Sequence, residues 1–430
     1  MPSEDTLITL PKTEIPRSWY NVLPDLPEPL EPYLTPSGEA VKPEQLAAIF
    51  PASLIEQELS PRRLFDIPVP VAEALARYRP TPLQRAAGLE KALGVRSRIY
   101  FKNESVSPSG SHKSNTALAQ AHFNREAGIR RLATETGAGQ WGTALSIAGC
   151  AFGLEIRVYM VRVSLEQKPY RKTVMNLMGA EVLSSPSDLT AAGRRAKAEN
   201  PRTLGSLGLA ISEAVEDAAS RSDTNYSLGS VLNHVILHQT VIGQEIKKQL
   251  SLAGVSPDYL IACHGGGSNF GGMAAPFVPE IKDGARIALI AAEPESCPTL
   301  TRGRFAHDHG DVAGLTPLLP MYTLGKDFQP PAIHAGGLRY HGASPIVSSL
   351  VKSGMVKPLA VGGADLFRYA ALFARTEFII PAPESAHALA AACLKALELE
   401  QAGTPGTIVF VLSGHGLLDL SAFESFIDTY

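Results

Sequence analysis

The sequence lacks several features that would place it in a specialised class of protein. It has no apolar run of 18 residues, and its N-terminus, MPSEDTLITLPKTEIPRSWY, lacks the basic start and apolar core of a secretion signal. Long runs of Lys or Arg are also missing, and the formal net charge is only -3. We therefore expect a cytoplasmic protein that neither spans a membrane nor binds the phosphate backbone of a nucleic acid.

Cysteine is scarce, and the four cysteines are far apart, at Cys150, Cys263, Cys297 and Cys393. They form no CxxC pair, and no His or Cys cluster has metal-ligand spacing, so neither a disulfide framework nor a metal site is expected. Each stands among apolar or small residues, which predicts buried, reduced thiols. The chain does have length and apolar content, because 430 residues with 45% hydrophobic side chains suffice for two or three domains with large cores.

Short apolar runs alternate with longer helical patterns from Arg98 onward, which is typical of parallel βα units. The predicted strands, rich in β-branched and aliphatic residues, are Arg98–Lys102, Arg131–Thr134, Ile156–Val161, Tyr259–Cys263, Ile287–Ala292 and Thr407–Leu412. The predicted helices are Asn115–Ala127, Thr143–Phe152, Val241–Leu250, Leu366–Arg375 and Ala386–Glu400. The pattern predicts an α/β fold with mostly parallel sheets.

Three regions are expected along the chain. Residues 1–60 form a proline-rich arm with one short helix around Glu44 to Phe50, to which we assign a packing role and no chemistry. An N-terminal lobe covers 61–225, and a C-terminal lobe covers 226–430. The segment 141–201 has strand and helix patterns of its own, so we expect a smaller mobile subdomain that gates a site.

A glycine loop follows the predicted strand that ends at Cys263. Its residues are Gly265, Gly266, Gly267, Ser268 and Asn269, and a helical stretch comes next. Successive glycines let backbone N–H groups turn toward an anion, and the two polar side chains add donors. A Walker A lysine and a GxGxxG spacing are both missing. The loop predicts a phosphate cradle, with a plain flexible turn as the alternative.

Lys113 ends the turn GSHK and stands at the start of a predicted helix. The positive end of the helix dipole and partial desolvation both disfavour the ammonium form, which predicts a lowered pKa and a reactive neutral amine. Such an amine forms a Schiff base with an aldehyde. A lysine taken alone is more often an exposed surface group, so the interpretation depends on the neighbouring motifs.

Four motifs stand in one order along the chain: GSHK at 110–113, ETGAGQWG at 135–142, GGGSN at 265–269 and LSGHG at 412–416. In this order they resemble the tryptophan synthase β chain family, most closely its second type, and the resemblance covers nearly all of residues 60–425. It implies pyridoxal-phosphate fold type II, with two lobes around the cofactor. It also implies β-replacement, in which indole and serine or phosphoserine give tryptophan through an aminoacrylate.

The resemblance implies roles for the residues of these motifs. Lys113 would hold pyridoxal 5'-phosphate and later move the substrate α-proton, and Gly265–Asn269 would hold the phosphate. Glu135 would act as general acid and base on the leaving group and the nucleophile. The loop that would bind the substrate carboxylate consists of Thr136, Gly137, Ala138, Gly139 and Gln140, with Gln140 also beside the ring oxygen of the cofactor.

Further roles are implied for three residues outside the central motifs. Ser413 would meet the pyridine nitrogen with a neutral hydroxyl, which favours β-elimination over transamination. His112 is a candidate for contact with the phosphate, and a structural histidine at a helix start is the alternative. Glu377 is a candidate for contact with the cofactor.

Two residues depart from the better-known β chains. Arg339, in GLRYHG, replaces an aspartate, and a guanidinium suits a phosphate ester better than a serine hydroxyl. The alternative for Arg339 is a structural ion pair between the lobes. Phe378 replaces a glycine after Glu377 and is expected to narrow the acceptor pocket.

These departures leave two alternatives to tryptophan formation. One is a related β-replacement or a serine deaminase with a different acceptor, and the other is a weakly catalytic partner subunit. The retained motif residues speak against the second. The resemblance also implies a homodimer and an indole-producing α subunit as partner, whereas the sequence leaves open whether a monovalent cation binds.

Overall fold

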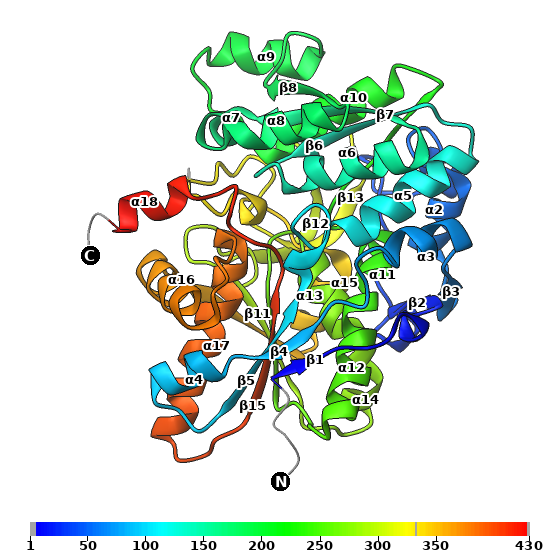
Figure 1. The fold of residues 1–430 in the computed structure, drawn as a ribbon. Coiled ribbons are helices and arrows are strands. Elements are labelled where there is room, and N and C mark those ends of the chain that lie inside the picture. The colour runs from blue at the N-terminus through cyan, green and yellow to red at the C-terminus, as the bar shows by residue number, and fades with distance from the viewer. Residues whose placement is uncertain (1–5, 332, 428–430) are drawn as a thin grey trace.

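Two sheets organise the chain in the computed structural model, which describes residues 6–331 and 333–427 (Figure 1). The larger sheet has seven strands in the order β1-β4-β5-β15-β10-β11-β14, and the smaller has four in the order β8-β7-β6-β9. The strands from β5 to β14 pair in parallel, as do all those of the smaller sheet, whereas β1 and β4 add an antiparallel edge. The predicted α/β architecture with mostly parallel sheets is confirmed.

The strands of the larger sheet are β1 (Leu7–Ile8), β4 (Leu83–Arg85), β5 (Arg98–Asn103), β10 (Tyr259–Cys263), β11 (Ala288–Pro294), β14 (Val356–Val361) and β15 (Thr407–Leu412). Those of the smaller sheet are β6 (Arg131–Thr136), β7 (Glu155–Val161), β8 (Glu181–Ser185) and β9 (Thr224–Tyr226). Two antiparallel ribbons pair β2 (Ser18–Tyr20) with β3 (Leu64–Asp66), and β12 (Arg304–His309) with β13 (Leu318–Thr323). The six predicted strands are confirmed as β5, β6, β7, β10, β11 and β15.

The helices of the first half are α1 (Pro43–Leu46), α2 (Ala52–Leu59), α3 (Val69–Leu75), α4 (Ala87–Leu93), α5 (Ser114–Glu126), α6 (Gln140–Phe152), α7 (Arg162–Gln167), α8 (Pro169–Leu177), α9 (Ala191–Glu199) and α10 (Leu207–Ala219). Those of the second half are α11 (Asn233–Gln239), α12 (Val241–Ala253), α13 (Ser268–Ala274), α14 (Val278–Lys282), α15 (Pro345–Lys352), α16 (Gly363–Glu377), α17 (Pro383–Gln401) and α18 (Ser421–Ile427). The five predicted helices are confirmed as α5, α6, α12, α16 and α17.

Helices cover both faces of the larger sheet, and alternate residues of a strand contact different helices. In β10, Leu260 and Ala262 belong to the apolar cluster that contains residues of α12 and α13. Ile261 and Cys263 belong to the cluster that contains residues of α17. Successive side chains of a strand point to opposite faces, so a strand covered on both sides needs apolar residues at every position. This requirement explains why continuous apolar runs predicted parallel strands.

The boundaries between the two sheets differ from the predicted boundary between the two lobes. The smaller sheet lies within one continuous stretch, 131–226, and with helices α6 to α10 forms the upper part of the molecule in Figure 1. Strands β4 and β5 also lie inside 61–225, but they pair in the larger sheet with strands from the C-terminal half. Movement of segment 141–201 stays a prediction.

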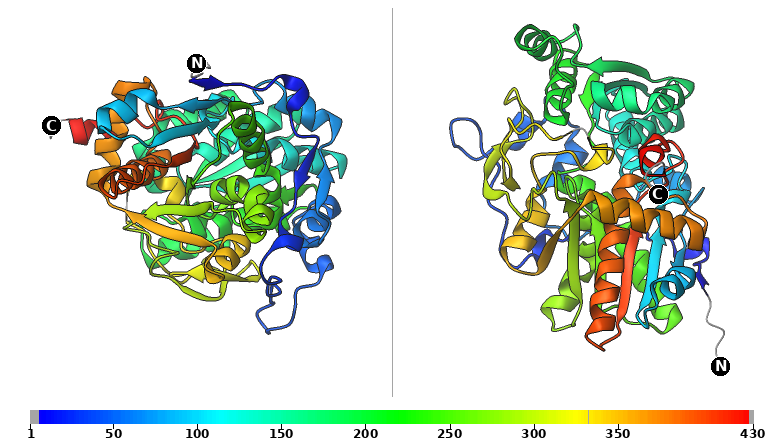
Figure 2. Two further views of the ribbon diagram at one scale, coloured as in Figure 1. Left: turned by 90° about the horizontal axis from the view of Figure 1, so that it is seen from below. Right: turned by 90° about the vertical axis from the view of Figure 1, so that its left-hand side faces the viewer.

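The N-terminal arm is more structured than one short helix. It supplies β1 to the edge of the larger sheet, pairs β2 with β3, and contains the two helices α1 and α2. In the left view of Figure 2 the arm, in blue, runs along one side of the molecule. The helix predicted around Glu44 to Phe50 is therefore shorter than expected, and α2 begins only after Pro51.

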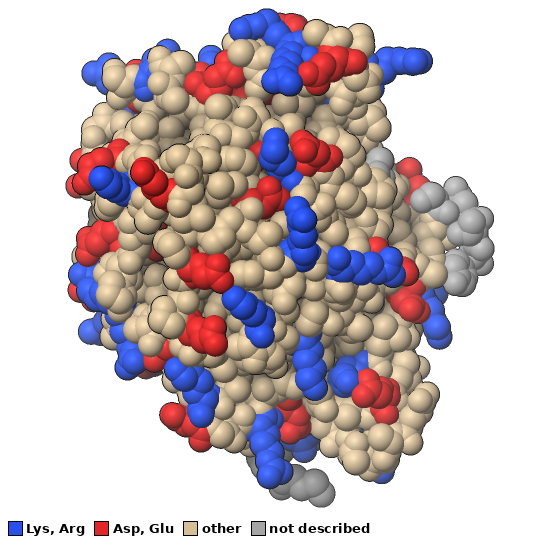
Figure 3. Space-filling view, turned by 180° about the vertical axis from the view of Figure 1, so that it is seen from behind, with Lys and Arg blue, Asp and Glu red and all other residues tan. Residues whose placement is uncertain are grey.

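Surface features agree with the sequence except at one cysteine. No helix among the described residues is long and apolar enough to cross a membrane. Figure 3 shows that basic and acidic side chains are interspersed over one face of the molecule. Cys263, Cys297 and Cys393 are buried free thiols, as predicted, but Cys150 is exposed. The prediction was wrong for Cys150 because small neighbours in α6 do not by themselves place a side chain on the packed face of the helix.

Candidate functional site

The carboxyl ends of three strands lead into residues that line two adjoining pockets. Cys263 ends β10, Ser413 follows β15, and Thr136 ends β6. β10 and β15 are neighbouring parallel strands of the larger sheet, so their carboxyl ends lie at the same edge, and the carboxyl end of β6 in the smaller sheet lines the adjoining pocket.

We call the first of these cavities the polar pocket. It is lined by His112, Lys113, Gln140, Ser230, Cys263, Gly265, Gly266, Gly267, Ser268, Asn269, Gly337, Leu338, Glu384 and Ser413. The second, the apolar pocket, shares part of this wall, namely Lys113, Gln140, Ser230, Gly266 and Gly337. A ligand held in the polar pocket would therefore contact whatever occupies the apolar pocket.

Lys113 stands at the start of α5 and lines both pockets. Its Nζ donates a hydrogen bond to the carbonyl oxygen of Gly229 at 3.1 Å. Burial lowers the pKa of Lys113 to about 8, although the negative charges of nearby groups, among them Glu384 and Glu135, act in the opposite direction. About one tenth of the amine is thus neutral at pH 7, far more than for an exposed lysine, and Schiff-base chemistry uses this neutral form.

The glycine loop after β10 lines the polar pocket with a backbone path that side chains would not permit. A Cβ atom at Gly265 would lie 2.7 Å from the carbonyl oxygen of Gly337, so that position cannot carry a side chain without displacing the backbone. Gly267 has φ of 107°, a conformation that side chains disfavour. Asn269 Oδ1 is buried without a partner. The cradle of backbone N–H groups fits the phosphate of pyridoxal 5'-phosphate.

Ser413 and His112 meet in the wall of the polar pocket. Ser413 Oγ lies 2.8 Å from Ser385 Oγ and 3.5 Å from Cys263 Sγ, so hydroxyl and thiol groups surround it in place of carboxylates. His112 Nδ1 lies 3.3 Å from the Ser413 carbonyl oxygen, and its Nε2 lies 3.5 Å from Ser268 Oγ. Burial, aided by the charge of Lys113, lowers the pKa of His112 to about 3. A neutral His112 beside the glycine loop can exchange hydrogen bonds with a bound phosphate.

Glu135 lies in the wall of the apolar pocket and is almost fully buried. Burial raises the pKa of Glu135 to about 7, while a hydrogen bond from Tyr226 and the charge of Lys113 limit the rise. A carboxyl group that titrates near neutral pH can both donate and accept a proton under physiological conditions. This is the property that the predicted acid–base role needs.

The loop from Thr136 to Gln140 turns from β6 into α6. Gly139 permits the turn with φ of 89°, and Thr136 Oγ1 accepts a hydrogen bond from the N–H of Gly142 at 3.2 Å. Thr136, Gly137, Ala138 and Gln140 line the apolar pocket. Four of the five residues predicted to bind a substrate carboxylate are thus brought next to Lys113 and Glu135.

Glu384 is a site residue that sequence reasoning missed. It lies in the polar pocket at the start of α17, where Oε2 accepts from Gln140 Nε2 at 3.0 Å and Oε1 accepts from the N–H of Gly337 at 2.9 Å. Glu384 belongs to the motif PAPESAHA. A carboxylate directly after a proline at the start of a helix is the sequence feature from which it could have been predicted as a site residue.

The predictions for Glu377 and Phe378 were wrong. Glu377 Oε1 accepts a hydrogen bond from the N–H of Leu89 at 2.6 Å, at the outer end of α16 and outside both pockets. Phe378 ends that helix with φ of 61°, and its side chain is 88% exposed. The carboxylate that reaches the polar pocket belongs to Glu384, seven residues later, and the ring of Phe378 cannot narrow an acceptor pocket.

Arg339 lies in a small cavity beside the apolar pocket, and Gly137 and Leu207 line both cavities. Its side chain is buried, Nε has no partner, and Nη2 donates only to the Pro330 carbonyl oxygen, at 3.4 Å. Burial lowers the pKa of Arg339. In the described part of the chain no carboxylate pairs with it, so the alternative of a structural ion pair is wrong there. A buried guanidinium with free donors suits an anion.

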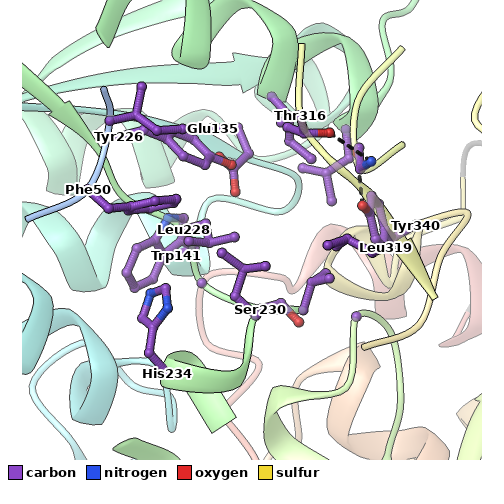
Figure 4. A pocket seen from close by; sticks show the side chains of 18 of the residues that line it. Phe50, Glu135, Trp141, Tyr226, Leu228, Ser230, His234, Thr316, Leu319 and Tyr340 are labelled. Atoms are coloured by element: carbon purple, nitrogen blue, oxygen red, sulfur yellow. Dashed lines mark hydrogen bonds between the residues drawn. The ribbon is translucent and has the colours of Figure 1, made fainter. Parts of the chain in front are cut away.

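The arm supplies much of the wall of the apolar pocket. Its contributing residues are Tyr33, Leu46, Ile49, Phe50, Leu54, Ile55 and Glu58. Trp141, Tyr226 and Leu228 complete the wall nearest to Glu135 (Figure 4). Phe50 and Tyr226 are in ring contact, with centroids 6.0 Å apart. The expectation that the arm has only a packing role was too narrow, because a flat apolar ligand in the apolar pocket would contact residues of the arm.

Known proteins resemble this chain over most of its length. Residues 75–414 match the family described as pyridoxal-phosphate dependent enzyme. The tryptophan synthase beta chain 2 of Thermotoga maritima is 58% identical over 418 residues, which cover 97% of this chain and 99% of that protein. The tryptophan synthase beta chain 2 of Aquifex aeolicus is 56% identical over 423 residues, with 97% and 98% covered.

Two solved structures show the same fold. A fungal L-serine ammonia-lyase from Rhizomucor miehei has a TM-score of 0.60 at 19% identity, covering 81% of this chain and 98% of that chain. A threonine deaminase from T.th. has a TM-score of 0.58 at 23% identity, with 80% and 97% covered.

Proposed function

Because this chain belongs to the tryptophan synthase β chain family of pyridoxal-phosphate-dependent enzymes, we propose that its two pockets hold the cofactor and the acceptor of one reaction. The fold is pyridoxal-phosphate type II, as predicted, and the chain is a pyridoxal-phosphate-dependent lyase that carries out tryptophan β-replacement. The observation that supports our residue assignment is the position of Lys113 in the wall common to both pockets.

In the polar pocket, each proposed contact follows from what the side chains present. Pyridoxal phosphate, when bound, supplies an electron sink for the electron pair left by removal of the substrate α-proton. Lys113 Nζ would hold the cofactor through its aldehyde group and would later move that proton, because its lowered pKa provides a neutral amine. The N–H groups of Gly265–Asn269 would hold the phosphate, and Ser413 would offer a neutral hydroxyl to the ring nitrogen.

Glu135 and the loop beside it act on the amino-acid substrate. The N–H groups of Thr136 to Gln140 bind the substrate carboxylate at the start of α6, where backbone donors are free. Glu135 gives a proton to the departing oxygen and then accepts one from the acceptor, since its pKa of about 7 makes both states accessible. Glu384 holds Gln140 in place through the hydrogen bond between their side chains.

The lining of the apolar pocket suits an aromatic acceptor better than an ordered water molecule. Leu46, Phe50, Trp141 and Leu228 line it without offering polar side-chain groups to an ordered water, apart from the indole N–H of Trp141, which donates to Thr134 Oγ1 at 2.6 Å. Deamination needs no second substrate, whereas β-replacement needs a pocket that holds the acceptor beside the amino-acid substrate. This lining favours indole and counts against the serine deaminase alternative.

Arg339 supports phosphoserine as the preferred amino-acid donor. A phosphate leaving group brings close to two negative charges toward the buried guanidinium of Arg339. This guanidinium has an unpartnered N–H, and no carboxylate of the described residues forms an ion pair with it. Serine offers only a neutral hydroxyl to the same group. The family resemblance further supports a homodimer, a cytoplasmic location and an α-subunit partner as proposals.

The proposed function is tested with purified holoenzyme and three small molecules. Serine or phosphoserine is supplied with indole, and tryptophan, pyruvate and phosphate are quantified together. We expect tryptophan as the main product, with phosphoserine the more efficient donor. Pyruvate formation that indole does not suppress would support the deaminase alternative instead.

A further inference from the structure

A buried cluster of three charged side chains joins helices α7 and α8 to the segment that follows β15. We call Lys168, Arg171 and Asp419 the ion cluster. Lys168 Nζ lies 2.6 Å from Asp419 Oδ1, Arg171 Nη2 donates to Asp419 Oδ2 at 2.9 Å, and each side chain is at most 2% exposed. In Figure 1 the C-terminal segment with α18 lies beside α7 and α8, where Ser421 Oγ donates to the Gln167 carbonyl oxygen at 3.2 Å.

The charges of the ion cluster fix its geometry. Burial by itself raises the pKa of Asp419, but the positive charges of Lys168 and Arg171 outweigh it and hold the pKa below its usual value. Asp419 is therefore ionised near neutral pH. Removal of one member of a buried ion pair leaves the other charge uncompensated, which costs far more than the loss of a surface pair. The cluster thus holds the segments that carry it at a fixed distance from one another.

Two members of the ion cluster contact segments that form the candidate site. A Cβ atom at Gly139 would lie 2.8 Å from Arg171 Cβ and 2.9 Å from its Cγ, so the stem of Arg171 packs against the backbone of Gly139. Gly139 belongs to the loop proposed to bind the substrate carboxylate. Lys168 Nζ donates a hydrogen bond to the His334 carbonyl oxygen at 2.9 Å, in the segment that leads to Arg339.

The third member, Asp419, belongs to the segment that starts at Ser413. Its N–H donates to the Gly416 carbonyl oxygen at 2.8 Å, which fixes the turn between Ser413 in the polar pocket and the ion cluster. Three site segments that are remote in the sequence therefore meet at one buried carboxylate. None of the three members is among the described residues that line the two pockets.

We propose that Asp419 is a positioning residue for the amino-acid substrate, because through Arg171 it holds the backbone of Gly139 where the loop can bind a carboxylate. The inference rests on the proposed function, which assigns carboxylate binding to Thr136–Gln140. Misplacement of a positioning group by about 1 Å costs on the order of 100-fold in rate. The affinity for the substrate should therefore depend on a side chain that lies outside both pockets.

The test compares two unreactive ligands, L-alanine and L-alaninamide, of which only the first has a carboxylate. Titration of the holoenzyme gives each dissociation constant from the change in visible absorption. We expect the parent to prefer L-alanine, and Asp419→Asn to lose about tenfold of this preference, since the variant keeps the size of the side chain and removes its charge. The cofactor content should stay unchanged, because the backbone hydrogen bond to Gly416 remains.

Asp217→Asn is the matched control. Asp217 is also a buried carboxylate with two cationic partners, Arg131 at 2.8 Å and Arg157 at 3.4 Å, but these three residues connect only β6, β7 and α10. This variant should lose stability and keep the parent's preference for L-alanine. A preference that survives in folded Asp419→Asn would overturn the proposal and would leave the ion cluster a purely structural role.

Arg171→Met provides a second variant in case Asp419→Asn does not fold. It leaves Lys168 and Asp419 as a balanced pair and keeps an apolar stem against Gly139, so only the ionic connection to the loop is lost. The preference for L-alanine should again fall about tenfold. In steady-state kinetics, the KM for the amino-acid donor should rise while kcat changes little, because binding is weakened equally in the ground and transition states.

The outcomes separate this inference from the proposed function. Equal affinity of the parent for L-alanine and L-alaninamide would refute the proposed carboxylate role of the loop, and the inference with it. A parent that prefers L-alanine, together with folded Asp419→Asn and Arg171→Met variants that keep the same preference, would refute the positioning role of Asp419 alone.

Discussion

Tyr226 Oη donates a 2.7 Å hydrogen bond to Glu135 Oε2, and both groups are buried. The bond stabilises the ionised carboxylate against the burial that raises the pKa of Glu135 to about 7. Tyr226 also contacts Phe50, so the arm, the smaller sheet and the acid–base group are joined at this point. The protonation of Glu135 is thus determined by packing as well as by its own chemistry.

Removal of this hydrogen bond should shift the pH dependence of the reaction. In Tyr226→Phe the ionised form loses a donor while the burial remains, so the pKa of Glu135 should rise further above 7. The limb of the kcat/KM profile that requires ionised Glu135 should then move to higher pH. An unchanged profile in a folded variant would show that this limb reports another group.

Lys113→Ala should lose the visible absorption of lysine-bound cofactor. Lys102 is the control lysine for cofactor attachment. It is buried as well, but it pairs with Glu245 at 2.7 Å and lines neither pocket, so it should carry no cofactor. Borohydride reduction followed by peptide mapping should find the cofactor on Lys113 in the parent. Trapping on a different lysine with normal turnover would contradict the assignment.

Arg339→Ala should lose mainly the advantage of phosphoserine over serine. We expect a loss of roughly 2–4 kcal/mol in kcat/KM for phosphoserine if the pair is desolvated, with little change for serine. Steady-state kinetics with both donors measure the difference. Arg339→Lys keeps the charge without the planar fork and should recover only part of it. Equal efficiency of the two donors in the parent would refute this role.

Phe378→Gly should stabilise the protein and leave acceptor kinetics unchanged. Phe378 holds a left-handed conformation with φ of 61° while its ring is 88% exposed, so glycine removes backbone strain and loses little packing. A gain of about 1 kcal/mol in the free energy of unfolding is expected from denaturant titration. A changed KM for indole would instead support a pocket narrowed by this ring.

Much of the fold follows from local sequence alone. The sequence predicts strand β10 to the residue, because a strand covered by helices on both faces must be apolar throughout, and Tyr259–Cys263 is bounded by polar and glycine residues. It does not predict strand β14, since VKPLAV carries a lysine and a proline that its edge position tolerates. The glycine loop and Lys113 are also recognisable from the sequence. An anion-binding loop and a lysine at the start of a helix are each defined by residues that are adjacent in the chain.

The tertiary structure alone decided which remote groups meet. Glu377 and Glu384 are both carboxylates near the end of the chain, and only the path from α16 into α17 places Glu384 in the polar pocket. Glu135 likewise depends on Tyr226, 91 residues away in sequence, which donates the hydrogen bond that limits the rise of its pKa. The sequence by itself determined the fold type and the lysine–glycine-loop pair. Burial and hydrogen-bond partners depend on residues distant in the chain, so only the folded protein could set the pKa of Glu135 and bring Glu384 to Gln140.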